Sequence, residues 1–206
     1  MSLSRRSAAI AIGGTTCAFL AALLVGWWRV DGPGAPRGSA PADALPLPFY
    51  DMDFQLTDHS GRKVGPSDWI GRPTLVFFGF TYCPDICPST LSNISSWLEE
   101  LGADASSRLQ VAFVTVDPDR DSVEVMADYV TNFHPAIVGY TGSPEQILQV
   151  AVGFRARFDR VSMKTGYTMN HTASVFVFDA RGKFVSSIDY HEPQENAVPK
   201  IRRVLR

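Results

Sequence analysis

Residues 74–91 read TLVFFGFTYCPDICPSTL, and this stretch decides the fold. Its first seven residues, 74–80, form a continuous apolar run rich in β-formers, which is typical of a strand buried on both faces of a largely parallel sheet. Pro88 suits the first position of a helix, with Cys87 as the capping residue before it. Cys83 is then expected in the loop that faces the helix N-terminus.

Cys83 and Cys87 therefore lie where a thiolate is stable. The N-terminus of a helix offers unpaired N–H groups and a partial positive charge, which lower the pKa of a thiol and favour its metal-binding, nucleophilic form. A spacing of four residues can bring both sulfurs within reach of a disulfide or of one metal ion. Thioredoxin-type oxidoreductases use CxxC, so the CxxxC spacing weakens that analogy. The spacing alone leaves open an electron carrier, a metal site and a structural disulfide.

The chain beyond residue 48 alternates predicted strands and helices. The expected strands, besides residues 74–80, lie at 54–57, 63–64, 109–116, 136–140, 172–178 and 183–188, and the expected helices at 88–101, 122–132, 143–157 and 195–205. This order predicts an α/β, thioredoxin-like fold with a central mixed sheet flanked by helices. The length of 206 residues favours one globular domain, expected over residues 49–206.

The N-terminal segment predicts a membrane anchor. Residues 8–28 are 21 consecutive positions without a charged side chain, long enough for a helix to cross a hydrocarbon core of about 30 Å. Arginines in residues 1–7 indicate a cytoplasmic N-terminus, which places the rest of the chain across the membrane. Bulky residues at 23–28 do not resemble a signal-peptide cleavage site, so we expect an uncleaved transmembrane helix. The protein is then a single-pass protein of the bacterial inner membrane with its globular domain in the periplasm.

Residues 29–48 contain five prolines and three glycines but few large apolar residues. Such a segment cannot bury enough surface to fold alone, and it predicts an extended tether. The formal net charge of −2 gives no basic bias, so we do not expect nucleic acid as a partner.

His171 supplies a third candidate ligand. It ends the segment YTMNH, residues 167–171, directly before the predicted strand at 172–178. We expect it to enter the sheet where thioredoxin-like proteins bring a loop beside their cysteines. Two thiolates and one imidazole form a donor set that is soft enough for Cu(I) and can also hold Cu(II), whereas zinc usually takes a fourth ligand.

The domain over residues 49–206 resembles the Sco/SenC family of copper-binding assembly proteins for cytochrome c oxidase. The resemblance rests on FFGFTYCPDICPSTL at 77–91, VTVDPDRD at 114–121 and YxxxH at 167–171. It implies a thioredoxin-like fold and one copper ion held by Cys83, Cys87 and His171. Family members commonly carry aspartate before the ligand histidine, and Asn170 here removes that charge, so copper affinity and the preferred oxidation state can differ.

The resemblance implies a membrane-tethered copper metallochaperone that delivers copper to the CuA centre in subunit II of cytochrome c oxidase. A second copper chaperone would be the donor. A Cys83–Cys87 disulfide would switch copper binding off, so a thioredoxin-like thiol reductant is also implied. The rival interpretation is a thiol-disulfide oxidoreductase that keeps the CuA-site cysteines reduced, or a redox sensor, for which His171 is dispensable. A peroxiredoxin-like peroxidase fits the paired cysteines less well.

Other polar residues near these motifs could surround the metal or form a partner surface: Asp85, Asp117, Asp119, Tyr167 and Asn170. The alternative for the aspartates at 117–121 is structural, namely to end a strand and cap the next helix, with Arg120 pairing locally. Met163 and Met169 are soft donors, although single methionines more often serve packing.

Overall fold

The structure is a computed structural model that describes residue 24 and residues 45–206. The expected anchor at residues 8–28, apart from residue 24, lies outside the described residues, as does most of the expected tether at 29–48. Within the described part of the chain, no helix combines the length and the apolar character needed to cross a membrane.

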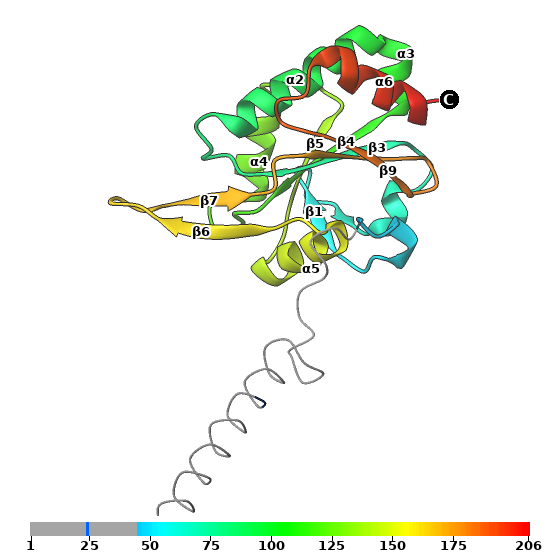
Figure 1. Ribbon diagram of the computed structural model, residues 1–206. Coiled ribbons are helices and arrows are strands. Elements are labelled where there is room, and N and C mark those ends of the chain that lie inside the picture. The colour runs from blue at the N-terminus through cyan, green and yellow to red at the C-terminus, as the bar shows by residue number, and fades with distance from the viewer. Residues whose placement is uncertain (1–23, 25–44) are drawn as a thin grey trace, which may run out of the picture. The chain divides into compact units, whose positions relative to one another are not determined.

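A seven-stranded mixed sheet forms the centre of the fold, in the order β2-β1-β5-β4-β3-β8-β9 (Figure 1). Its middle strands are parallel: β3 (Thr74–Gly79), β4 (Gln110–Thr115) and β5 (Ile137–Thr141). Antiparallel strands flank them, with β1 (Leu56–Asp58) and β2 (Lys63–Val64) on one side and β8 (Val175–Phe178) and β9 (Phe184–Ile188) on the other. All six residues of β3 are buried, which confirms the strand predicted from the apolar run.

Helices cover both faces of the sheet, as predicted (Figure 1). One face carries α2 (Ile86–Leu101), α3 (Ala103–Arg108), α4 (Val123–Val130) and α6 (Gln194–Val204). The opposite face carries α5 (Pro144–Phe154) and two short 3-10 helices, Phe49–Asp51 and Pro66–Trp69. Successive strand residues point to opposite faces, so Phe78 packs on Phe154 of α5, with ring centroids 5.3 Å apart, while Phe77 faces α2.

Several helix boundaries differ from the prediction. Helix α2 begins at Ile86 with Asp85 as its N-cap, so Cys87 lies inside the first turn and not before it. Pro88 is accommodated there because the first N–H groups of a helix have no intrahelical partner. Helix α5 ends at Phe154 and not at residue 157, because Arg155 adopts a left-handed conformation with φ 56°. The short helix α3 was not predicted, since its sequence ADASSR lacks large apolar side chains.

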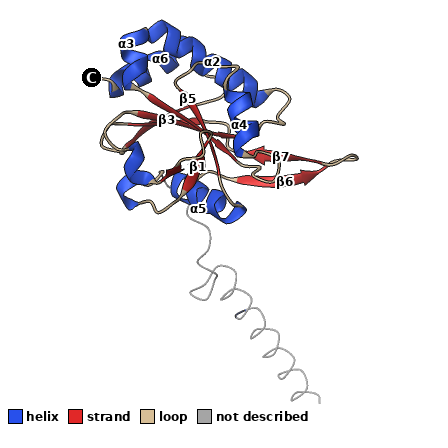
Figure 2. Ribbon diagram, turned by 180° about the vertical axis from the view of Figure 1, so that it is seen from behind, coloured by secondary structure: helices blue, strands red, loops and turns tan. Residues whose placement is uncertain are grey.

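A separate two-stranded hairpin projects from the domain in both views (Figures 1 and 2). It consists of β6 (Phe158–Ser162) and β7 (Tyr167–His171), paired antiparallel with Phe158 opposite His171. The sequence did not predict it, because most of β6 is exposed and shows no apolar alternation. The expectation for His171 was therefore wrong in one respect: this residue ends β7 of the hairpin, and the next strand of the main sheet starts only at Val175.

Candidate metal site

Cys83, Cys87 and His171 meet beyond the carboxyl end of β3, and their donor atoms all lie within 4.8 Å of one another. The Nε2 atom of His171 is 3.4 Å from the sulfur of Cys87. A metal bonded at about 2.3 Å to sulfur and about 2.0 Å to nitrogen can bridge donors up to about 4.3 Å apart, so this separation fits a shared ion. Both cysteines are free thiols.

The tautomer of His171 is set by its neighbour. Its Nδ1 atom lies 3.0 Å from the carbonyl oxygen of Thr172, which can only accept a hydrogen bond. Nδ1 therefore carries the proton, and Nε2 is left as the donor atom that faces Cys87. The imidazole ring also packs edge-on against Phe77 and Phe80, with centroids 6.1 and 5.8 Å away. These contacts orient the ring without occupying Nε2.

The two thiols differ strongly in acidity. The hydrogen bond from the Cys87 thiol, helped by the N–H groups of Asp85 and Cys87 and by nearby His171, lowers the pKa of Cys83 to about 5 despite partial burial. The same hydrogen bond, together with burial, raises the pKa of Cys87 well above its ordinary value. Cys83 is partly exposed and Cys87 is fully buried. At neutral pH the pair therefore holds one accessible thiolate and one buried thiol.

Gly79 provides the space that Cys87 occupies. A Cβ atom on Gly79 would lie 2.9 Å from the Cys87 sulfur and 2.8 Å from Cε2 of Phe113, closer than such atoms approach. This requirement was not recognised from the sequence, because a glycine in an apolar strand does not reveal what packs against it. The glycine in FFGF is thus part of the site.

The SCO1/SenC family model matches residues 43–206. The chain belongs to the SCO1/SenC family. Among its curated relatives is the mitochondrial SCO2 homolog of Danio rerio, which is 40% identical over 147 residues, covering 70% of this chain and 52% of the relative. The mitochondrial SCO2 protein of Saccharomyces cerevisiae is 30% identical over 156 residues, covering 74% of this chain and 52% of the relative. The chain thus spans about half the length of these curated relatives.

Solved structures of SCO1/SenC relatives have the same fold. ScoI of Bradyrhizobium japonicum with copper bound is 36% identical, with a TM-score of 0.69, and the match covers 78% of this chain and 99% of that one. Yeast Sco1 with copper bound is 31% identical, with a TM-score of 0.68, covering 78% and 87% of the two chains. These matches confirm the predicted thioredoxin-like α/β fold of the SCO1/SenC domain.

The other candidate residues fall into two groups. Asp117, Asp119 and Tyr167 are connected: buried Asp117 pairs with Arg120 and accepts a hydrogen bond from the Tyr167 hydroxyl at 2.8 Å, while Asp119 pairs with Arg160. Asp85 and Asn170 are exposed. Asp85 instead accepts a local hydrogen bond from the Ser89 hydroxyl at 3.3 Å.

The two methionines considered as soft donors have different environments. Met163 is 60% exposed near the tip of the hairpin, and Met169 packs against the core. Within the described residues, the group of side chains able to hold a metal consists of Cys83, Cys87 and His171.

Asp121 anchors the loop that leads to Cys83. Its buried carboxylate accepts hydrogen bonds from the hydroxyl and the N–H of Thr81, at 2.6 and 3.1 Å, and from the hydroxyl of Thr115. Burial nevertheless raises the pKa of Asp121 above its ordinary value. These contacts join the ends of β3 and β4, and they favour the structural interpretation of this aspartate.

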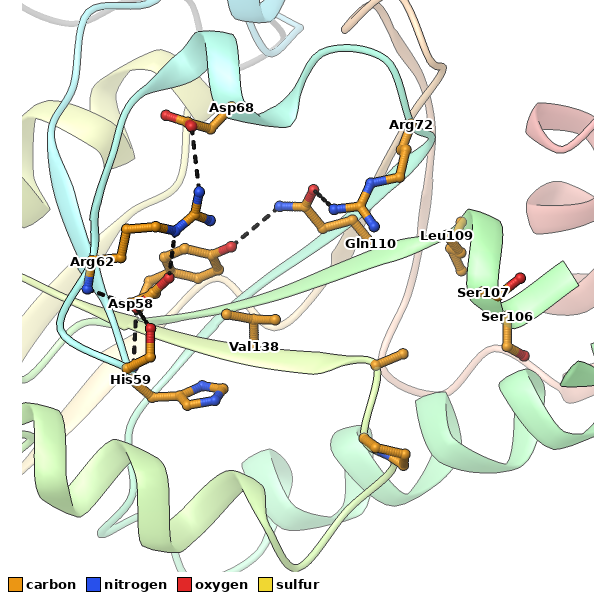
Figure 3. Close-up of a pocket in the computed structure, with 14 residues that line it drawn as sticks. Asp58, His59, Arg62, Asp68, Arg72, Ser106, Ser107, Leu109, Gln110 and Val138 are labelled. Atoms are coloured by element: carbon orange, nitrogen blue, oxygen red, sulfur yellow. Dashed lines mark hydrogen bonds and ion pairs between the residues drawn. The ribbon is translucent and has the colours of Figure 1, made fainter. Parts of the chain in front are cut away.

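A different hollow, of about 420 Å³, opens near the amino ends of the parallel strands (Figure 3). Its charged and polar residues are largely paired with one another. Arg62 pairs with Asp58 and Asp68, and Gln110 accepts from Arg72 and donates to Tyr140. The residues that line it include none of the three candidate ligands. The chemistry of this SCO1/SenC chain therefore centres on the cysteine–histidine cluster.

Proposed function

We propose that the chain binds one copper ion, as Cu(I) or Cu(II), through Cys83, Cys87 and His171 and delivers it during assembly of cytochrome c oxidase. The 3.4 Å approach of His171 Nε2 to the Cys87 sulfur carries this proposal, because a pair of redox cysteines needs no third donor. Two thiolates and one imidazole suit copper. The copper bound in the Bradyrhizobium and yeast relatives supports the same assignment.

Copper is the cargo of this site, and three protein ligands allow it to leave. An incoming thiolate can bind the ion before the old bonds break, and solvent reaches Cys83 and His171, which are both partly exposed. The proposed acceptor is the CuA centre in subunit II of the oxidase, and the proposed donor is another copper chaperone.

Copper binding requires both cysteines to be reduced. Oxidation of Cys83 and Cys87 to a disulfide removes two electrons and both thiolate ligands, so the oxidised protein would not hold the ion. A thioredoxin-like thiol reductant would restore the binding form. The redox state of Cys83 and Cys87 thus decides whether the chain can bind copper.

The proposed location is the bacterial inner membrane, with residues 8–28 as a single anchor and the domain in the periplasm. This part of the proposal rests on the uncharged run of 21 residues and on the arginines before it. An anchored chaperone would diffuse in the same membrane as its acceptor.

A thiol-disulfide oxidoreductase acting on the CuA-site cysteines is the second candidate. It is favoured by the contrast between Cys83, partly exposed with a pKa of about 5, and buried Cys87. An accessible thiolate can attack a disulfide, and the second thiol can then resolve the mixed disulfide.

Copper binding and disulfide reduction, measured in parallel, separate the two candidates. Copper chaperoning predicts that Cys83→Ser, Cys87→Ser and His171→Ala all lose tight, stoichiometric copper. The matched control is His191→Ala, which removes an exposed imidazole. A reductase instead keeps its activity in His171→Ala and loses it in both serine variants. Normal copper binding by His171→Ala would show that the three-ligand proposal is wrong.

A further inference from the structure

The two halves of the proposed copper site come from separately built elements. Cys83 and Cys87 follow the central strand β3, whereas His171 ends the β6–β7 hairpin, whose strands pair with each other and not with the main sheet. Ladder hydrogen bonds of the main sheet therefore do not fix the hairpin. Besides the short link from His171 to Val175 of β8, side-chain contacts hold His171 beside the cysteines.

Arg120 contacts both halves. Its guanidinium carbon lies 4.7 Å from the ring centroid of Tyr82, the residue before Cys83, and 3.9 Å from that of Tyr167 on β7. Its Nη1 atom also donates to the carbonyl oxygen of Tyr167 at 3.3 Å. Through Nε, Arg120 forms an ion pair with buried Asp117. One arginine thus joins the cysteine loop to the histidine strand.

Tyr167 is held from both sides. The guanidinium carbon of Arg160 lies 4.0 Å from its ring centroid, close to the 3.9 Å of Arg120. One face of a phenol ring cannot accommodate two guanidinium groups at this distance, so the two lie on opposite faces. Asp117 and Asp119 pair with the two arginines and offset their repulsion. The Tyr167 hydroxyl donates to Asp117, which closes the cluster.

The stack is linked directly to the orientation of His171. Tyr167 and His171 are four residues apart on β7, so their side chains project from the same face of the strand. Phe80 is near both groups, with its centroid 5.9 Å from the Arg120 guanidinium and 5.8 Å from the His171 ring. A change in the stack would move the hairpin face that presents the imidazole.

We propose that Arg120 is a positioning residue that holds the β6–β7 hairpin next to the cysteine loop through the stack formed by Tyr82, Arg120, Tyr167 and Arg160. This inference rests on the proposed copper function. It assigns Asp117, Asp119 and Tyr167 to positioning the histidine, not to binding the metal.

The conservative variants distinguish positioning by stacking from a general effect on stability. Arg120→Lys keeps a positive charge near Asp117 but loses the planar group that stacks. Tyr167→Phe keeps the aromatic ring and loses only the hydroxyl, whereas Tyr167→Leu loses the ring. Arg202→Gln is the matched control, because it removes a surface arginine paired with Glu100, an interaction outside the stack.

The test uses the full-length chain and measures Cu(I) affinity by competition with a chromophoric chelator, together with hydrogen exchange of residues 158–171. We expect Arg120→Lys and Tyr167→Leu to weaken Cu(I) binding about tenfold to hundredfold and to speed exchange in the hairpin. Tyr167→Phe should stay within about threefold, and Arg202→Gln should match the unmodified chain. When the protein is loaded with Cu(II), the nitrogen hyperfine signal of His171 should weaken in Arg120→Lys and Tyr167→Leu only.

Unchanged hairpin exchange and copper affinity in folded Arg120→Lys and Tyr167→Leu would overturn the inference. So would an equal loss of affinity in Arg202→Gln. If Arg120→Lys does not fold, Tyr167→Leu and Arg160→Gln decide the outcome, since Arg160 is half exposed. Cys87→Ser is measured alongside: copper retained by that variant contradicts the proposed function, whereas copper lost there but kept in the stack variants contradicts only the positioning role.

Discussion

The Nε2 atom of His171 lies 3.4 Å from the sulfur of Cys87, although the two residues are 84 positions apart in the chain. The contact joins the first turn of α2 to the end of the β6–β7 hairpin. A metal that bridges these atoms binds the folded chain more tightly than the unfolded one, in which His171 is not held beside the cysteines, so the difference in binding free energy adds to the stability of the fold. The site and the tertiary structure are therefore coupled.

Gly79→Ala should displace Cys87. The added methyl group would lie 2.9 Å from the Cys87 sulfur and 2.8 Å from a ring carbon of Phe113 in a fully buried strand. We expect a loss of about 1–3 kcal/mol in the free energy of unfolding, typical of overpacking, measured by urea denaturation. Copper affinity should also fall, because the sulfur moves away from His171.

Gly139→Ala is the control for this substitution, because it adds the same methyl group to another buried strand. Its nearest neighbours are side-chain methyl groups of Met126 and Val130, both at 3.1 Å, which can shift. Copper binding by this variant should be normal. If Gly79→Ala binds copper as well as Gly139→Ala does, Gly79 is not needed to seat the sulfur.

Copper binding at pH 7 should release about one proton, because only one of the two cysteines still carries its proton. The pKa of Cys83 is about 5, so this residue is already a thiolate, whereas the raised pKa of Cys87 keeps it a thiol until the metal displaces the proton. Calorimetry in buffers of different ionisation enthalpy counts the protons. Release of about two would contradict the low pKa of Cys83.

The same asymmetry appears in metal-free, reduced protein. Alkylation of Cys83 by iodoacetamide should rise as the pH passes about 5 and level off below pH 7, since the thiolate is the nucleophile. Tandem mass spectrometry, which locates the modification within the peptide, distinguishes alkylation of Cys83 from that of Cys87 four residues later. Cys87, fully buried, should remain unmodified under these conditions.

The sequence predicted those parts of the fold that carry a periodic or capping signal. The apolar run of residues 74–80 corresponds to β3, buried on both faces. The helix predicted from residue 143 begins with a capping box: the Ser143 N–H donates to the Gln146 side chain at 2.8 Å, and the Gln146 N–H donates to the Ser143 hydroxyl at 3.3 Å. Interactions between residues close in the sequence were sufficient to predict the structure at these positions.

The parts that were missed depend on contacts between distant segments. The β6–β7 hairpin has little buried surface, so its sequence lacks the alternation that marks a strand. Arg120 was expected to pair locally, and it does pair with Asp117, but its stacking on Tyr82 and Tyr167 requires three segments to meet. The YxxxH spacing contains part of this signal, because it places Tyr167 and His171 on one face of a strand.

Asp58 should give the fold a component of stability that is lost in acid. Burial alone would raise its pKa, but hydrogen bonds from Ser60 and Arg62 outweigh burial and hold the pKa below the ordinary value of 3.8. Because the folded pKa is the lower one, the carboxylate stabilises the fold above pH 3.8, and this contribution disappears as the pH falls through the folded pKa.

Asp58→Asn therefore should lower the free energy of unfolding by about 1–3 kcal/mol at pH 7, and the difference from the unmodified chain should shrink below pH 3.8. Urea denaturation at a series of pH values measures both effects. Asp53→Asn, at an exposed position of the same region, is the control and should show neither. A difference that stays constant with pH would mean that ionisation of Asp58 is not the cause.

Asn170→Asp introduces a negative charge beside the proposed ligand His171, and its effect should be small. Asn170 is exposed, and neighbouring residues of a strand point to opposite faces, so its side chain projects away from that of His171. By Coulomb's law, a solvated carboxylate held about 8 Å from a unit charge in a water-like dielectric contributes about 0.5 kcal/mol, or roughly a twofold change in affinity. The change should favour Cu(II) over Cu(I), because the ion of higher charge gains more, and it should fade in high salt because the side chain is solvated. Competition titrations with each ion at low and high ionic strength measure it. An effect of tenfold or more that persists in salt would mean that residue 170 turns toward the metal when copper binds.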